Sequence, residues 1–208
     1  MFGDGALTFH EFMTGELLPL ARIHDAVLKF LKGRDDAVLY GAQAVNAYVD
    51  APRMTADVDI VSPRAAELAE ELRAELNERF QIAVRVREVK EGLGYRLYQV
   101  QKPNNRHLVD VRAVAMLPPA QRIEEVLVVT PVELIAGKVL ACARRFGRPK
   151  SFLDRRDLAE LLLAFPELKS DTGAVRERLE AMGADRQVLA LWSQLAAEEI
   201  LPEEDDGF

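Results

Sequence analysis

The sequence predicts an α+β fold in which a mixed sheet with flanking helices is followed by an all-helical C-terminal lobe. Two observations lead to this prediction. Short strand-like segments alternate with helical segments up to Thr130-Pro131, and beyond that point apolar residues recur at helical spacing only. A chain of 208 residues is long enough for one core and an added helical lobe. We therefore expect two domains, residues 1–129 and residues 130–208.

The front half is expected to begin with a helix between Pro19 and Gly33, because proline suits a first helical position and glycine the position after the last. Ser62-Pro63, a cap and first-turn pair, predicts another helix. Apolar or alternating runs predict strands at residues 37–40, 56–61, 82–89, 95–100, 107–114 and 123–129. In the back half, leucine and valine residues recur at helical spacing throughout.

The overall composition excludes several classes of function. Hydrophobic residues make up 49% and charged residues 29% of the chain, and the formal net charge of -7 gives no bulk attraction to nucleic acid or anionic membranes. No apolar run approaches the roughly 20 residues that span a bilayer. The single cysteine, Cys142, cannot form an internal disulfide, which fits a reducing compartment. We expect a soluble, cytoplasmic protein without membrane contact.

The most informative segment is Ala56-Asp57-Val58-Asp59-Ile60-Val61. Alternate residues of a strand face the same way, so Asp57 and Asp59 are predicted to share one face about 7 Å apart. Two carboxylates that converge to ~4 Å repel by about 4 kcal/mol at an effective dielectric constant of about 20. A cation relieves this repulsion, and Mg2+ prefers oxygen ligands. The pair predicts a magnesium site, although an isolated Asp-x-Asp pair is also common on surfaces and in turns.

A third carboxylate, Asp110, stands in the apolar strand-like segment Leu108-Val-Asp-Val-Arg112. If this strand lies beside the first, Asp110 completes a site for two metal ions, which clamp the attacking and leaving oxygens of an in-line phosphoryl displacement. Asp110 can also accept the proton of the attacking hydroxyl. His107, three residues earlier, has no metal-ligand spacing and is interpreted as structural.

A glycine at a strand-to-helix turn, Gly41, precedes these acids, and backbone N–H groups at such a turn can point at a phosphate. A glycine turn, then Asp-x-Asp, then a later strand acid resembles the nucleotidyltransferase superfamily, whose fold is like that of polymerase β. The closer resemblance is to the AbiEii/MenT-like nucleotidyltransferases, the toxin components of type IV toxin–antitoxin pairs. It is carried by Gly41-Ala-Gln-Ala44 and Pro52-Arg-Met-Thr-Ala-Asp57-Val-Asp59.

The resemblance continues through the back half, in Thr130-Pro131-Val-Glu-Leu134, Lys138, the basic run from Arg144 to Lys150, and Asp154-Arg-Arg-Asp157-Leu158. It implies that the nucleotide is held at Gly41 and Ala42 and that Lys138 contacts the triphosphate. It also implies that Asp154 or Asp157 completes the site. Ala42 departs from the superfamily pattern, which has glycine or serine there, so a hydroxyl that helps to hold phosphate is missing.

Several of these residues have a second interpretation. Arg53 can reach a phosphate or form a salt bridge, and Lys138 can be an ordinary solvated lysine. Asp154 and Asp157 lie i, i+3 on one helix face and can instead pair with Arg155, Arg156 or Lys150. The basic residues between Arg144 and Arg156 can bind a nucleoside triphosphate or an RNA backbone, or can form a polar helical hairpin.

The sequence thus predicts a magnesium-dependent enzyme that transfers a nucleoside monophosphate from a nucleoside triphosphate to a hydroxyl. Asp57, Asp59 and Asp110 would bind the metal ions, with Lys138 and Asp157 in catalysis. By resemblance, the acceptor is tRNA or another RNA, and a partner antitoxin restrains the enzyme. Two alternatives are a non-catalytic nucleotide-binding module, which Ala42 favours, and a small-molecule transferase of the aminoglycoside-modifying type.

Overall fold

The computed structural model describes residues 18–89 and 91–202. This part of the chain forms two compact units. The first contains the residues before Ala44 together with Met54–Val128, and the second contains Ala44–Arg53 together with the residues from Val129 onward. The sequence placed the boundary between residues 129 and 130. It did not foresee that residues 44–53 of the front half belong to the second unit.

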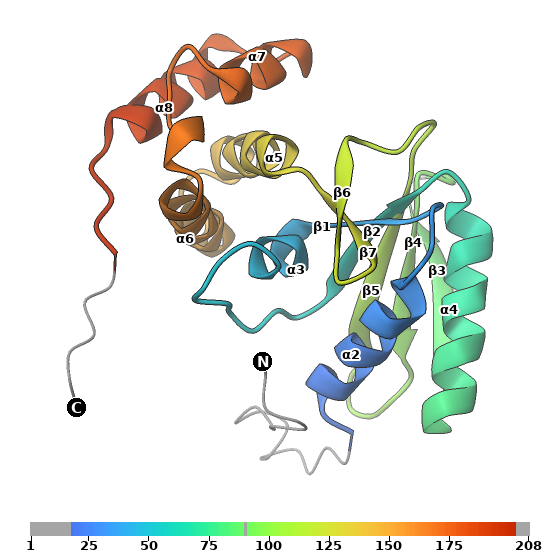
Figure 1. Cartoon of the computed structure of the whole chain (residues 1–208). Helices are drawn as coiled ribbons and strands as arrows, with labels where there is room; N and C mark the ends of the chain where they lie inside the picture. The colour runs from blue at the N-terminus through green and yellow to red at the C-terminus, as the bar shows by residue number, and fades with distance from the viewer. Residues whose placement is uncertain (1–17, 90, 203–208) are drawn as a thin grey trace, which may run out of the picture. The chain divides into compact units, whose positions relative to one another are not determined.

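The first unit is built on a seven-stranded sheet with the order β3-β4-β5-β2-β1-β7-β6 (Figure 1). Its strands are β1 (Val38–Tyr40), β2 (Val58–Ser62), β3 (Val84–Val89), β4 (Gly94–Gln99), β5 (Arg106–Ala113), β6 (Ala120–Ile123) and β7 (Val126–Val129). Strand β2 pairs with β5 in parallel and with β1 antiparallel, while β1 pairs with β7 in parallel. The prediction of a mixed sheet is confirmed.

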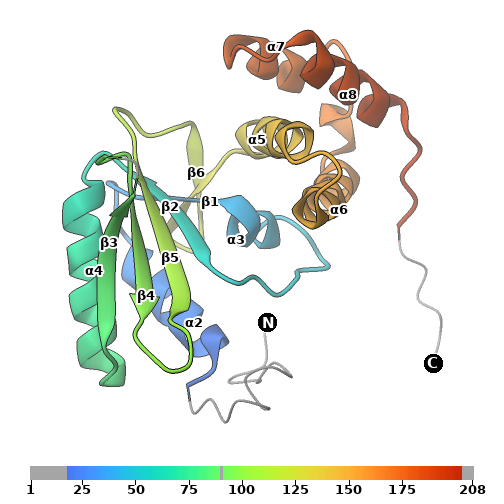
Figure 2. The ribbon, with the colours of Figure 1, turned by 180° about the vertical axis from the view of Figure 1, so that it is seen from behind.

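Two helices, α2 (Leu20–Leu31) and α4 (Ala65–Phe80), cover one face of this sheet (Figure 1). Apolar residues at helical spacing form the contact, and Leu68, Leu72 and Leu76 of α4 are 0% exposed. Alternate strand residues point to opposite faces, so the residues between the buried ones emerge on the other side. Figure 2 shows β3, β4 and β5 from that side, where no helix in the described part of the first unit covers them.

The segment expected as one strand at residues 123–129 is two strands joined by a tight turn. Strand β6 ends at Ile123 and β7 begins at Val126, and the turn residues Glu124 and Glu125 have φ 46° and φ 71°. Both values lie in the left-handed region that glycine and asparagine favour. Because the sequence has no such residue at this point, its apolar alternation predicted a continuous strand.

The second unit is helical. It consists of α5 (Pro131–Arg144), α6 (Pro149–Ala164), the 3-10 helix η1 (Pro166–Leu168), α7 (Ala174–Ala181) and α8 (Arg186–Ala197), and α3 (Gly41–Asn46) leads into its segment 44–53. Helix α5 packs against α6, α7 and α8, around a core that includes the fully buried Trp192. The hydroxyl of Tyr48 donates a 2.7 Å hydrogen bond to the carbonyl of Val129, which fixes the segment 44–53 to this unit. Among the helices of residues 18–89 and 91–202, none is long and apolar enough to cross a membrane.

Candidate active site

Two of the three predicted acids lie side by side in the sheet of the first unit. Strands β2 and β5 pair in parallel with Asp59 opposite Asp110. Directly opposite residues of neighbouring strands project to the same face, so the two carboxylates share one side of the sheet. Asp57 lies one residue before β2 begins. The expectation that Asp57 sits within a strand is therefore wrong.

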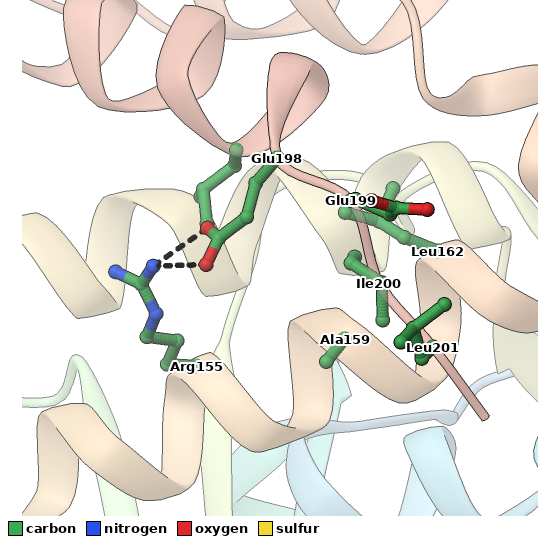
Figure 3. A pocket seen from close by; sticks show the side chains of 8 residues that line it. Arg155, Ala159, Leu162, Glu198, Glu199, Ile200 and Leu201 are labelled. Carbon is green, nitrogen blue, oxygen red and sulfur yellow. Dashed lines mark hydrogen bonds and ion pairs between the residues drawn. The ribbon is translucent and has the colours of Figure 1, made fainter. Parts of the chain in front are cut away.

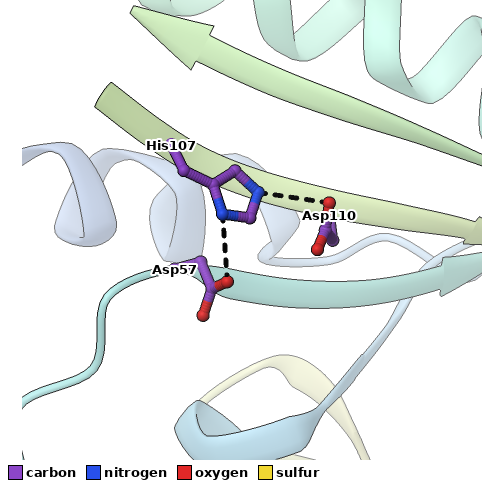
Figure 4. Close-up of side chains that lie close together, drawn as sticks. All are labelled: Asp57, His107 and Asp110. Atoms are coloured by element: carbon purple, nitrogen blue, oxygen red, sulfur yellow. Dashed lines mark hydrogen bonds and ion pairs between the residues drawn. The ribbon is translucent and has the colours of Figure 1, made fainter. Parts of the chain in front are cut away.

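His107 lies between two of the acids (Figure 4). Its Nδ1 is 3.2 Å from Oδ2 of Asp57, and its Nε2 is 3.1 Å from Oδ1 of Asp110. The sequence-based interpretation of His107 as structural missed this position. A spacing of three residues along a regular strand puts two side chains on opposite faces, so the pattern gave no reason to join His107 to Asp110.

A β-bulge explains how His107 reaches the acids. In the pairing of β4 with β5, Leu97 is opposite Val109 while the next residue, Tyr98, is opposite His107. Leu108 is left as an extra residue on β5, and such an insertion changes which face the following side chains occupy. The bulge therefore turns His107 to the face that carries Asp110. This shift depends on the partner strand, so it has no signal in the local sequence.

Basic side chains balance the charge of Asp110. The guanidinium of Arg96 on β4 donates to both of its carboxylate oxygens, at 2.8 and 3.2 Å. Burial opposes the charged form of Asp110, but the hydrogen bonds from His107 and Arg96 outweigh it and lower the pKa of Asp110 to about 2. Burial also opposes the charged form of His107, but its bonds to Asp110 and Asp57 raise the pKa of His107 to about 9. At neutral pH an imidazolium thus separates two carboxylates.

Gly41, which follows β1, lies against the second acid. A Cβ atom on Gly41 would be 2.1 Å from Oδ2 of Asp59, and the φ of Gly41 is +73°. Both the space and the backbone conformation therefore require glycine. Ala42 follows with no hydroxyl, so a phosphate at this turn would depend on backbone N–H groups.

A shallow pocket lies beside Asp110, and its lining includes Tyr40, Leu93, Gly94, Arg96 and Arg112. The guanidinium of Arg112 lies over the ring of Tyr40, 5.0 Å from its centroid. Burial and the charge of Asp59 raise the pKa of Tyr40, so its hydroxyl stays protonated. Two guanidinium groups, a hydroxyl and the exposed Leu93 together suit an anionic ligand that also has an apolar part.

The donor atoms at this site fit a divalent cation. Asp57, His107 and Asp110 each offer one ligand atom, and these atoms all lie within 4.8 Å of one another. Asp59 projects from the same face, in register with Asp110. Carboxylate oxygens suit Mg2+ or Mn2+, and His107 can act as a ligand only after its imidazolium loses a proton, because the protonated ring has no lone pair to offer.

The remaining predicted residues form an ion cluster within the second unit. The side chain of Asp157 is 1% exposed and accepts hydrogen bonds from Arg53, at 2.6 and 2.9 Å, and from Lys138, at 2.6 Å. The ammonium of Lys138 is also 3.4 Å from Asp154, to which Arg145 donates at 2.9 Å. Burial opposes the charge of Asp157, but the hydrogen bond from Arg53 and the charge of Lys138 lower its pKa.

This cluster shows which partners the predicted residues have within the described part of the chain. Arg53 forms a salt bridge, and Lys138 is buried rather than solvated. Asp157 pairs with these two residues, and not with the neighbouring basic residues of its own helix that the sequence offered as alternatives. Arg53 and Asp157 are separated by 104 positions in the chain, so only the fold could reveal the pairing.

Half of the basic run in the second unit is paired with acids of that unit. Arg155 forms an ion pair with Glu198 at 2.6 Å, beside a pocket that Leu162, Ile200 and Leu201 also line (Figure 3). Arg156 lies 3.6 Å from Glu160, and Arg145 is held by Asp154. Arg144, Arg148 and Lys150 remain exposed. The interpretation as a polar helical hairpin therefore describes half of this run.

Comparison with solved structures places the fold in a known class. The chain resembles the Megavirus polyadenylate synthase with a TM-score of 0.60 at 14% sequence identity, over 79% of this chain and 35% of the viral one. It resembles JHP933 from Helicobacter pylori with a TM-score of 0.54 at 15% identity, over 92% of each chain. At these identities the likeness establishes the fold alone, and this chain spans about a third of the length of the viral enzyme. The mixed sheet with flanking helices is therefore a fold that this chain shares with both proteins.

The family follows from a match over most of the sequence. A family model described as nucleotidyl transferase AbiEii toxin of type IV toxin–antitoxin systems matches residues 25–207. The chain belongs to this family and is an NTP-dependent nucleotidyltransferase, as its motifs predicted. A search of curated proteins gave no match.

Proposed function

We propose that this protein is a magnesium-dependent nucleotidyltransferase that transfers a nucleoside monophosphate from a nucleoside triphosphate to a hydroxyl of an acceptor, as a toxin. The observation that supports this most is the in-register placement of Asp59 and Asp110, with Asp57 and Asp110 joined through His107. An enzyme that consumes nucleoside triphosphates works where they are made, so the proposed location is the cytoplasm. An antitoxin partner is proposed from the family's type IV toxin–antitoxin description.

The three acids have distinct parts in this proposal. Asp57, Asp59 and Asp110 hold the divalent ions, and when bound such ions neutralise charge on the triphosphate and on the leaving oxygen. Asp110 stays ionised at neutral pH because its pKa is about 2. It therefore suits ligation and orientation of the acceptor hydroxyl better than proton acceptance, which works best with a pKa near the working pH.

For the second unit we propose that Lys138 and Arg53 contact the phosphates of the nucleoside triphosphate. The carboxylates of Asp157 and Asp154 would hold these two cations in position. The side chain of Lys138 is 10% exposed and held by two carboxylates, which fixes its direction. A fixed cation loses little further freedom when it meets an anion, so its contact costs less conformational entropy. Asp157 would then act as a positioning residue rather than through direct contact with the nucleotide.

The proposed acceptor is an RNA, with tRNA included. The test is incubation of the protein with labelled nucleoside triphosphates, Mg2+ and total RNA. We expect label on RNA, and a loss of at least about 100-fold in the Asp57→Asn and Asp110→Asn variants because each removes a metal ligand. Asp25→Asn, at an exposed ion pair with Lys29 on α2, is the matched control and should keep its activity.

Each of the other outcomes would assign a different function to this protein. Magnesium-dependent nucleotide binding without transfer to RNA, protein or small acceptors would identify a non-catalytic module. Transfer to an aminoglycoside but not to RNA would identify a small-molecule transferase. If there is neither transfer nor nucleotide binding, the proposed function is wrong.

A further inference from the structure

Figure 2 shows the side of β3, β4 and β5 that faces away from α4, here called the open face. The strand register places on it a row of charged residues that ends at the acids. Arg87 of β3 is opposite Arg96 of β4, and Arg96 is opposite Asp110 of β5. Asp110 is in turn opposite Asp59 of β2. Opposite residues share a face, so this row crosses the sheet from the edge strand β3 to the acids.

Two neighbouring rows extend the same pattern. Arg85 is opposite Tyr98, which is opposite His107. On the other side, Gly94 is opposite Arg112. Because residues two apart on a strand lie about 7 Å from each other on one face, Arg85 and Arg87 stand next to each other on β3. The open face therefore has four arginines within reach of the site, and three of them, Arg85, Arg87 and Arg96, are neighbours of Tyr98.

These arginines are an unfavourable arrangement for the protein by itself. Arg87 is directly opposite Arg96, a like-charge arrangement that disfavours a sheet and that Asp110 offsets only on the side of Arg96. Arg85, Arg87 and Arg112 are exposed, and none of them forms an ion pair with any residue in 18–89 or 91–202. The whole chain has a net charge of -7, so a cluster of arginines is not explained by a general excess of basic residues. An anionic ligand would remove the repulsion.

We propose that the open face binds the backbone of a single-stranded RNA and leads its hydroxyl end along Arg87 and Arg96 to Asp110. This inference rests on the proposed nucleotidyl transfer and names the surface that takes the acceptor. Arginines supply phosphate contacts, and the ring of Tyr98 among them offers a stacking platform for a base. Proteins that bind single-stranded nucleic acids typically combine basic side chains, which contact phosphates, with aromatic side chains, on which bases stack.

Charge also decides between the acceptors that the fold allows. A polycationic aminoglycoside would meet a face that carries the same sign of charge, and association would be slowed. In the basic run of the second unit Arg145, Arg155 and Arg156 already contact acids, which leaves Arg144, Arg148 and Lys150 as the competing surface for RNA. The open face offers cations that no acid of the described residues neutralises, Arg96 excepted.

The test is RNA binding in the absence of nucleotide and metal. The probe is a fluorescein-labelled single-stranded RNA of mixed sequence, titrated by anisotropy at several salt concentrations. The variant Arg85→Gln/Arg87→Gln should raise Kd about tenfold and reduce the slope of log K against log salt by about 1.4, since each phosphate contact on a single strand contributes about 0.7. Its melting temperature should not fall, because the substitutions relieve a like-charge pair.

The matched control is Arg144→Gln/Arg148→Gln, which changes the net charge equally at two exposed arginines of the second unit. It should bind the RNA within about twofold of the unchanged protein. The inference is overturned if this control loses affinity while the β3 variant does not, or if the β3 variant binds normally and only self-associates. Self-association would mean that Arg85 and Arg87 protect an edge strand.

Label transfer is measured separately with the same variants, so the two proposals can fail independently. If RNA binding depends on Arg85 and Arg87 but no RNA is labelled, the proposed function fails and the open face still stands as an RNA surface. If RNA is labelled equally well by the β3 variant and the unchanged protein, the proposed function stands and the open face is not the acceptor surface.

Discussion

At the scale of single residues, Gly41 gives the most direct test of the acid site. Any side chain there meets the carboxylate of Asp59, and φ +73° adds about 1–2 kcal/mol of backbone strain for a residue with a Cβ. We expect Gly41→Ala to displace Asp59 and to lower nucleotide transfer about 100-fold, since a shift of roughly 1 Å in a catalytic group can have that effect. Label transfer and thermal unfolding measure the two effects.

Gly33→Ala is the matched control for this substitution. Gly33 has the same φ, +73°, but a Cβ there would meet nothing within 4 Å. It should lose a similar amount of stability and keep its activity. Equal activity in Gly41→Ala and Gly33→Ala would show that the contact with Asp59 has no part in catalysis.

The sequence foresaw the acids but not the basic residues that hold them. Asp59 and Asp110 were identifiable because carboxylates are rare in apolar strands, and their adjacency needed only the pairing of β2 with β5. The sequence around Arg96 and His107 contains no comparable pattern that would identify them as site residues. Arg96 depends on the β4–β5 register, and His107 depends on the bulge at Leu108.

At the scale of elements, the β6–β7 turn predicts a stabilising substitution. Glu125 has φ 71°, and its carbonyl accepts hydrogen bonds from the backbone N–H of Gly33, at 3.0 Å, and from Arg122, at 2.9 Å. Glycine keeps these backbone bonds and removes the left-handed strain, so Glu125→Gly should raise the free energy of unfolding by about 0.5–1 kcal/mol. Urea denaturation measures it.

Glu125→Ala separates strain from charge, because it removes the carboxylate and keeps the Cβ. The carboxylate lies 3.8 Å from Lys32 and is 75% exposed, so its loss should change stability by less than about 0.5 kcal/mol. If both variants change stability equally, backbone strain is not the cause.

The helices and most strands could be predicted because the spacing of apolar residues within each element is visible in its own sequence. Helices α2 and α4 place leucine, isoleucine and valine at a period near 3.6, and each buries that stripe. The break between β6 and β7 could not be predicted, because Glu124 and Glu125 are not turn-forming residues. Tertiary pairing on both sides of the turn overrides their local preference.

At the scale of the whole molecule, the units do not follow the order of the chain. The sequence pattern divides the chain near residue 130, where strand-like segments give way to apolar residues at helical spacing only. The fold instead assigns residues 44–53 to the second unit, where Tyr48 and Arg53 make hydrogen bonds across a long sequence separation. The paired ions Arg53, Lys138 and Asp157 are therefore part of how this second unit is built.

This ion cluster predicts how stability depends on pH. The pKa of Asp157 is lowered below its ordinary value of 3.8, so the folded state favours the charged carboxylate. Its contribution is complete above pH ~4 and is lost as the pH falls through the lower folded pKa. Asp157→Asn leaves Arg53 and Lys138 without their buried partner and should cost about 3–5 kcal/mol at pH 7.

Urea denaturation between pH 7 and pH 3 should show the difference between the two proteins begin to narrow below pH ~4, because the carboxylate of the unfolded original protein takes up a proton there and this favours its unfolding. Asp25→Asn is the matched control: its carboxylate is 56% exposed and pairs with Lys29 on the surface of α2, so it should cost less than about 0.5 kcal/mol at every pH. A gap between Asp157→Asn and the unchanged protein that stayed constant down to pH 3 would mean that asparagine disturbs the packing of the second unit, and that the charge of Asp157 is not what stabilises it.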